Sequence, residues 1–92
     1  MKYKVEFKLT NRQTPVSSRY RPDWISTTKP EYNCAQLLFT DKYTVSQGES
    51  RECILEPFAI YSWNNVKVGD VLKCMEGPTE VGHATVLEIF EK

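Results

Sequence analysis

Apolar and polar residues alternate along much of the chain, and this period of two is the dominant pattern of the sequence. In residues 3–9, Tyr3, Val5, Phe7 and Leu9 fall on one side, and charged residues fall on the other. A strand with one buried face shows this alternation. We therefore expect a strand here, and further strands at 19–28, 34–40, 51–58, 71–75 and 81–90.

Turn-forming residues separate these segments. Pro15 and Gly48 mark two turns, and Gly77 with Pro78 joins the last two strands into a hairpin. Because Pro22 cannot donate a ladder hydrogen bond, we place it at the start, the edge or a bulge of its strand. No segment shows a helical period, so the sequence predicts an all-β sandwich or barrel in one domain, residues 1–92.

The last expected strand differs from the others because it is apolar on both sides. Thr85, Leu87 and Ile89 alternate with Val86 and Phe90. A strand with two apolar faces is typical of one that is covered by other elements on both sides. We expect residues 81–90 to be such a strand.

Composition narrows the class of protein. The 92 residues are 40% hydrophobic and 26% charged, which is ordinary for a globular chain. No apolar run approaches the roughly 20 residues that span a bilayer, and the start MKYKVEFKLT lacks the apolar core of a signal peptide. We expect a cytoplasmic protein with no membrane partner.

Charge is unevenly distributed although the net charge is zero. Residues 1–30 hold seven Lys and Arg against two acids, whereas residues 31–92 hold five against ten. The basic part contains Arg19 and Arg21, in the run RYRPDW. This asymmetry is compatible with a basic partner-binding face, and equally with ion pairs that form between the two parts on folding.

Residues that carry chemistry are sparse. Phosphate-binding and dinucleotide-binding glycine loops are absent, as are GxSxG and HExxH, so we expect no enzyme, no nucleotide and no cofactor. His83 has no fixed nucleophile or orienting acid and is expected to be an ordinary strand residue. Cys34, Cys53 and Cys74 are scattered, which favours buried free thiols over a disulfide framework or a metal site.

The eleven aromatic residues allow two interpretations. Tyr3, Phe7, Phe39, Phe58 and Phe90 fall on apolar faces and are assigned to the core. The remaining candidates, with the two arginines, suit a stacking platform for single-stranded nucleic acid; they are Tyr20, Trp24, Tyr61 and Trp63. Zero net charge weakens that interpretation, since phosphate affinity comes mainly from Lys and Arg.

The order of several short runs resembles the C-terminal domain of elongation factor Tu. The runs here are TPV (14–16), YRPDW (20–24), QGES (47–50), EPF (56–58) and KVGDVLKCMEGPTEVGHATVLEIFE (67–91). The family shows TPF, GYRPQF, PGD, HPI and EGGRTVGAGVV in the same order. The resemblance covers nearly the whole chain, and it implies a small closed antiparallel β-barrel of about six strands without the GTPase domain.

The resemblance also implies partners. The family's domain contacts the T-stem of aminoacyl-tRNA, packs against the GTPase domain and meets the nucleotide exchange factor. Glu76 and Gly77 match the family at the T-stem site. Asp23 stands where the family has Gln, and Thr79 and Glu80 replace Arg and Thr. Each change makes the local charge more negative, which disfavours a phosphate backbone.

We therefore expect a non-enzymatic barrel that binds a macromolecule, and we expect this macromolecule to be a protein. Two versions are a translation-related mimic of its relative and an immunity or antitoxin-type protein; the alternative is a tRNA- or RNA-binding module that keeps the T-stem face. No metal is expected. The candidate partner-binding residues are Arg19, Tyr20, Arg21, Asp23, Trp24, Glu76 and Gly77.

Overall fold

Every regular element that the structure describes is a β-strand. The structure is a computed structural model, and it describes residues 1–26, 32–39, 44–58, 63 and 66–90. The strands are β1 (Lys2–Leu9), β2 (Asp23–Ser26), β3 (Tyr32–Leu38), β4 (Ser50–Pro57), β5 (Val71–Glu76) and β6 (Thr79–Phe90). The all-β prediction is confirmed. Among the described residues no helix is long and apolar enough to cross a membrane.

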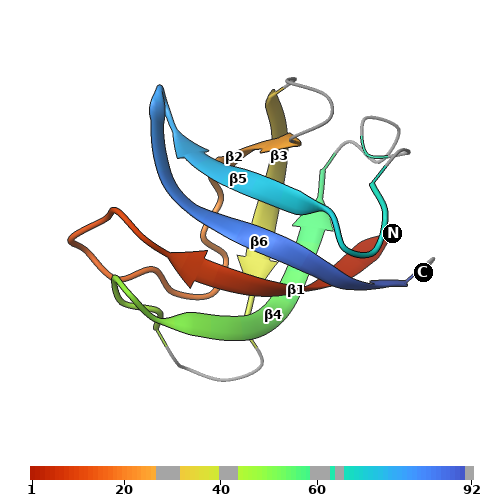
Figure 1. Ribbon diagram of the computed structural model, residues 1–92, viewed down its shortest axis with the longest axis horizontal. Helices are drawn as coiled ribbons and strands as arrows, with labels where there is room; N and C mark the ends of the chain where they lie inside the picture. The colour runs from red at the N-terminus through yellow and green to blue at the C-terminus, as the bar shows by residue number, and fades with distance from the viewer. Residues whose placement is uncertain (27–31, 40–43, 59–62, 64–65, 91–92) are drawn as a thin grey trace.

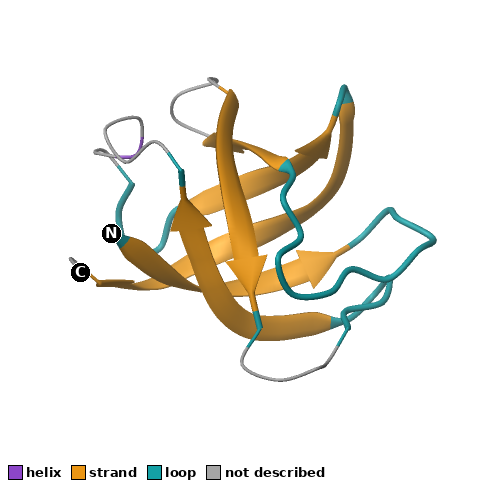
Figure 2. Cartoon of the chain, turned by 180° about the vertical axis from the view of Figure 1, so that it is seen from behind, coloured by secondary structure: helices purple, strands orange, loops and turns teal. Residues whose placement is uncertain are grey.

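The six strands close into an antiparallel barrel in the order β1-β4-β3-β2-β5-β6, with β6 returning to pair with β1. Figures 1 and 2 show this ring from the two sides, with the start of β1 next to the end of β6. The predicted six-stranded closed barrel is therefore confirmed. Closure pairs every strand with two neighbours, which removes the open edges of a flat sheet.

Inward-facing residues from the alternating pattern fill the barrel. Tyr3, Val5, Phe7 and Leu9 of β1 are all buried, as their spacing predicted. They meet buried residues from every other strand and from the loops, including Trp24, Leu37, Leu55, Leu72 and Val86. Burying a side chain of this size contributes about 1.5–3 kcal/mol. The core therefore lies inside the ring, and the outward side chains of all six strands are left for solvent or a partner.

Two β-bulges curve the long strand β6. Its pairing with β5 shifts at Val81, and its pairing with β1 shifts at Leu87. Val86 points inward and Leu87 outward, where it is 40% exposed, and the second bulge keeps Glu88 outward too and returns Ile89 to the core side. The expectation that both faces of this strand are covered was wrong. The apolar residues on both sides reflect a bulge, which reverses the alternation and bends the strand around the barrel.

Gly82 lies at a point where β6 passes very close to β1, and this contact yields a prediction about stability. Gly82 pairs with Leu9 of β1 and with Cys74 of β5. A Cβ at Gly82 would overlap the carbonyl oxygen of Lys8. We expect Gly82→Ala to lower the free energy of unfolding in urea by about 2–3 kcal/mol, since backbone atoms must move.

The control for this prediction is Gly77→Asn in the β5–β6 turn. Gly77 has a φ of 60° and open space around it, and Asn tolerates this left-handed conformation. We expect Gly77→Asn to change stability far less than Gly82→Ala. Equal losses for the two variants would contradict the close approach of β6 to β1.

Candidate functional site

Exposed and buried side chains alternate along the run RYRPDW. Arg19, Arg21 and Asp23 are exposed. Between them, Tyr20 is half-buried, and Pro22 and Trp24 are buried. The segment thus places three charged side chains on the outside and anchors itself by the other three.

Pairing with β3 fixes the register of this segment. Tyr20 bridges to Leu37 and Asp23 pairs with Cys34, so the two pairings keep one register and place Arg21 beside Gln36. β2 itself begins at Asp23, directly after Pro22, which confirms that the proline stands at a strand start. The expected strand began earlier, at Arg19, whereas Arg19 lies in a turn and residues 20–22 form only the single bridge at Tyr20.

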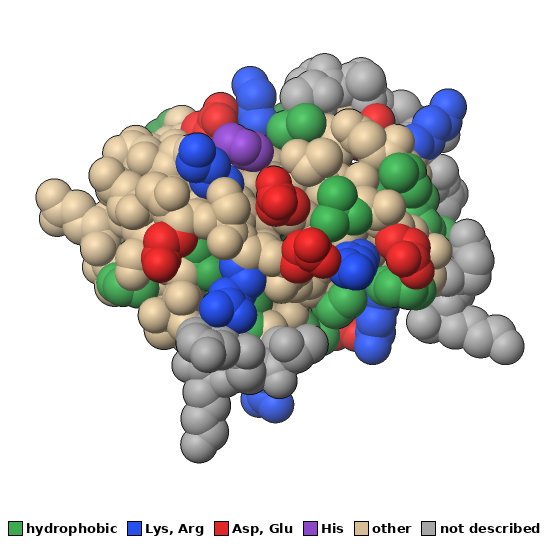
Figure 3. Space-filling model, turned by 60° about the horizontal axis from the view of Figure 1, so that its bottom comes forward, with side chains coloured by type: hydrophobic (Ala, Val, Ile, Leu, Met, Phe, Trp, Pro, Cys, Tyr) green, Lys and Arg blue, Asp and Glu red, His purple; other side chains and the backbone are tan. Residues whose placement is uncertain are grey.

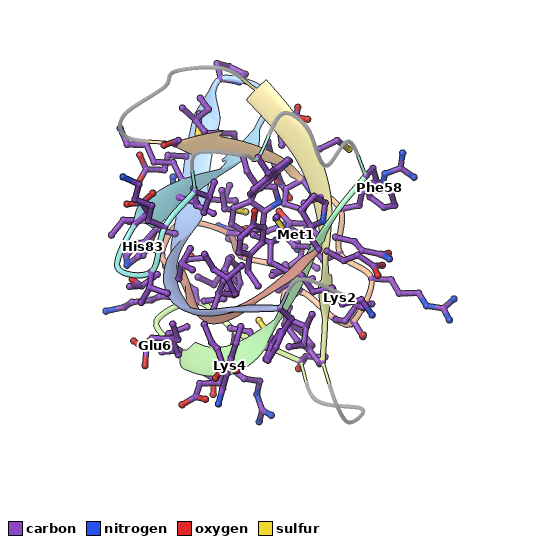
Figure 4. All side chains as sticks on the ribbon, turned by 90° about the vertical axis from the view of Figure 1, so that its right-hand side faces the viewer. Met1, Lys2, Lys4, Glu6, Phe58 and His83 are labelled. Atoms are coloured by element: carbon purple, nitrogen blue, oxygen red, sulfur yellow. The ribbon has the colours of Figure 1, made fainter. Side chains whose placement is uncertain are left out.

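Arg21 lies over the ring of Phe58, which follows the end of β4. The guanidinium carbon is 4.5 Å from the ring centroid, within the range of a cation–π interaction. Phe58 is 48% exposed, so its assignment to the core was wrong. Cys53, Leu55 and Pro57 point inward, and strict alternation turns the next residue outward. Figure 4 shows Phe58 projecting outside the ring of strands.

We call the exposed group on this side the β2–β3–β4 wall; it comprises Arg19, Arg21, Asp23 and Phe58. Within the described part of the chain, neither arginine forms an ion pair. Glu56 on the neighbouring strand is occupied, since it accepts a hydrogen bond from Gln36 at 2.7 Å and lies 3.5 Å from Lys2. The two cations of the wall are therefore not neutralised by described acids.

Arg12 forms one of the ion pairs that join the basic and acidic parts of the chain, beside those of Lys2 and Lys4. Its Nε donates to Glu76 Oε2 at 2.7 Å, and the Tyr20 hydroxyl donates to the same oxygen. The guanidinium also donates to the carbonyl oxygens of Thr14 and Pro15 and lies 5.2 Å from the Tyr20 ring centroid. This Arg12–Tyr20–Glu76 cluster ties the segment before β2 to the β5–β6 hairpin.

Hydrogen bonding and burial shift the pKa values of Glu76 and Tyr20 in this cluster. Partial burial favours the neutral form of Glu76, but the hydrogen bonds from Tyr20 and Arg12 outweigh it and hold the pKa of Glu76 below its usual value. Burial, followed by the hydrogen bond to Glu76, raises the pKa of Tyr20 well above its usual value. The cluster therefore holds a neutral phenol against a carboxylate near neutral pH.

The predicted partner-binding residues thus divide into separate groups. Arg19, Arg21 and Asp23 lie together on the β2–β3–β4 wall. Tyr20 and Glu76 meet in the cluster, and Gly77 lies in the adjoining hairpin turn. Sequence reasoning missed Arg12, because nothing local marks a contact to a residue 64 positions away.

The two tryptophans belong to the interior, which corrects their assignment to the free aromatics. Trp24 is 1% exposed, donates from Nε1 to the Ala35 carbonyl at 3.1 Å and meets the Phe7 ring edge-on. Trp63 is 2% exposed and packs on Tyr3 with ring centroids 5.7 Å apart. Trp24 therefore supports the wall from inside and does not reach a partner. Tyr61 lies outside the described residues.

The outer face made by β1, β4 and β6 has a different character. Lys4 and Glu52 form an ion pair at 3.2 Å, and they line an open hollow of about 240 Å³ together with Cys53 and Ile54. Figure 3 shows basic and acidic side chains interleaved over this side of the molecule. Interleaved charges of both signs do not make the continuous basic track that a nucleic-acid backbone requires.

The candidate catalytic groups are not brought together. His83 lies on the outer wall, in register with Lys8 and Lys73, on the opposite side of the ring from Phe58 (Figure 4). Cys53 and Cys74 are buried, and burial raises the pKa of each thiol to about 12. No three His, Cys, Asp or Glu side chains in the described residues are arranged to hold a metal ion.

Comparison of the chain with protein-family models and with curated proteins finds no match. The established result is therefore the fold, a small closed six-stranded antiparallel β-barrel.

The burial of two of the three thiols leads to a prediction about reactivity. Since the thiolate is the reactive form, Cys53 and Cys74 should resist a disulfide reagent such as DTNB near neutral pH, and half-buried Cys34 should react first. All three should react after unfolding in guanidinium chloride. Rapid reaction of two or more thiols in the folded protein would contradict the described core.

The lowered pKa of Glu76 leads to a prediction about pH. An unfolded Glu titrates near about 4.3. The folded pKa is lower, so the carboxylate stabilises the fold fully above the unfolded value and loses this contribution as the pH falls through the folded value. Glu76→Gln should therefore lower the free energy of unfolding by about 1 kcal/mol near neutral pH, a figure reduced because the side chain is more than a third exposed.

Denaturant titrations of both proteins across the acidic range measure this difference. It should shrink toward zero as the pH falls below the folded pKa of Glu76. A difference that stays constant with pH would show that the carboxylate charge contributes nothing.

Proposed function

We propose that this chain is a non-enzymatic β-barrel module of the cytoplasm that docks a protein partner through the β2–β3–β4 wall. The observation that carries the proposal is the exposed pair of Arg21 and Phe58. Arginine and aromatic residues are enriched among the residues that dominate binding at protein interfaces. Here the pair is solvent-facing and is held by a rigid barrel, so a partner meets it already ordered.

The charge of the wall favours protein over RNA. It offers two unpaired cations in the described residues, one acid and one exposed aromatic ring. Binding to a nucleic-acid backbone gains affinity from many phosphate contacts, and single-strand binding adds several stacked bases. One ring and two cations provide few phosphate contacts and few positions for stacked bases.

The resemblance to the C-terminal domain of elongation factor Tu supports a partner from translation, and a toxin-binding immunity role is the second version of the same proposal. Two features separate this barrel from the T-stem function that the resemblance implies. Asp23 adds an acid to the wall, and the Glu76 carboxylate is already occupied by Arg12 and Tyr20. Both features make this surface less able to bind a phosphate backbone.

Charge reversal on the wall tests the proposal. We expect a stoichiometric protein partner recovered with the wild-type barrel to be lost with Arg21→Glu, because the variant removes the cation and the interaction with Phe58. Lys8→Glu is the matched control, since it makes the same charge change on exposed β1, which lies on the other side of the barrel. Equal recovery with both variants would place the binding site elsewhere. Circular dichroism melts verify that each variant is folded.

A gel shift with tRNA tests the RNA alternative. Docking to protein predicts no shift even at low salt. A clear shift at low salt that fades steeply as salt is raised, and that Arg21→Glu removes, would favour the RNA-binding module instead.

A further inference from the structure

Arg19 occupies a backbone conformation that does not suit it. The Tyr20 amide donates to the Ser17 carbonyl at 3.1 Å, which closes a four-residue turn, and Arg19 is the third residue of this turn. Its φ is 74°, and it is the only described residue other than glycine with a positive φ. A turn with positive φ at this position favours Gly or Asn, and the left-handed conformation costs other residues about 1–2 kcal/mol.

Contacts of the Arg19 side chain do not offset this strain. The side chain is exposed, and in the described part of the chain it takes part in no ion pair or side-chain hydrogen bond. The contact that matters for the fold is made by its backbone, since the Arg19 amide donates to the Leu37 carbonyl at 2.6 Å. Glycine would make the same backbone contact without strain. Residues held in strained backbone conformations cluster at functional sites, which indicates that the Arg19 guanidinium has a function.

The backbone sets how the charges of the wall are arranged. Arg21 and Asp23 are successive outward residues of extended backbone, and such residues stand about 6.5–7 Å apart, whereas Arg19 is exposed on the preceding turn. The wall therefore presents two cations followed by an acid along the chain, with the Phe58 ring next to Arg21.

We propose that the β2–β3–β4 wall binds an acidic segment of a partner protein, with two carboxylates that meet Arg19 and Arg21 and an apolar side chain that meets Phe58. The inference rests on the proposed function and names the chemistry of the partner. Guanidinium groups match carboxylates in paired hydrogen bonds.

The third charge distinguishes a polypeptide from a nucleic acid. A phosphate backbone continues with a negative charge at every nucleotide, and one of these would face Asp23. A polypeptide can place a neutral or basic residue there, which makes its pattern complementary to the wall along its whole length.

Selection from a library of random peptides displayed on phage tests the inference with a defined probe. Immobilised wild-type barrel is the target, and the selected peptides are synthesised and their affinities measured by fluorescence anisotropy. We expect enrichment of peptides with at least two Asp or Glu residues and an apolar residue close to them. Each lost guanidinium–carboxylate contact should weaken binding by about tenfold or more.

Arg19→Gly is the decisive variant, because it separates folding from binding. It relieves the strain, so its melting temperature should equal or exceed that of the wild type, while its affinity for the selected peptides falls about tenfold or more. Arg19→Asn, which also tolerates the left-handed conformation, should behave in the same way. Lys8→Gln on β1 is the control and should bind as tightly as the wild type.

The outcomes distinguish the inference from the proposed function. Peptides without acidic enrichment that still lose binding in Arg21→Glu would overturn the acidic partner and leave docking at the wall in place. Acidic peptides that bind Arg19→Gly as tightly as the wild type would also overturn the inference. Recovery of no peptide, together with a tRNA shift that depends on Arg21, would overturn both.

Discussion

The buried indole of Trp24 fixes the register on which the outer wall depends. Its ring packs edge-on against Phe7 from the far side of the barrel, and its Nε1 donates to the Ala35 carbonyl of β3. A tryptophan that buries roughly 150–250 Å² gains about 4–6 kcal/mol. β2 has only four residues, so this one side chain contributes a large share of what holds the strand in place. A slip by one residue would bring the indole out and take Arg21 and Asp23 into the core.

The same register determines what the wall can do. Because Trp24, Pro22 and Tyr20 point inward, the charged residues between them must point outward. The Arg12–Tyr20–Glu76 cluster holds the other end of the segment against the β5–β6 hairpin. A segment fixed at both ends keeps its outward side chains in a constant arrangement, which lowers the entropy lost when a partner binds. The barrel interior is filled by side chains, and the binding site that we propose is therefore on the outside.

The sequence predicted the fold well, because a barrel depends on alternation and alternation is visible in the residues. The six strands were found, and the closed six-stranded barrel that the resemblance implied is confirmed. The errors arose where alternation is interrupted. A bulge at Leu87 shifts the alternation of β6, and the strand that was expected to begin at residue 19 begins at Asp23. The position of a bulge depends on how the barrel closes, and no single residue in β6 predicts it.

The candidate site was predicted only in part. The three outward charges of RYRPDW lie together as that run suggested, whereas Trp24 belongs to the core. Phe58 was assigned to the core as part of an apolar face, whereas the structure gives the inward position to Pro57 and the outward one to Phe58. Its contact with Arg21 joins residues 37 positions apart, and Arg12 with Glu76 are farther apart still. Such contacts follow from the strand order, which the period of two does not determine.

A two-dimensional NOESY spectrum of the wild-type barrel tests the central claim, that one register buries Trp24 and exposes Arg21 against Phe58. This register predicts a slowly exchanging Trp24 indole proton with cross-peaks to core residues. It also predicts Arg21 side-chain protons with upfield ring-current shifts and cross-peaks to the Phe58 ring. A rapidly exchanging indole, with no contact between Arg21 and Phe58, would contradict it.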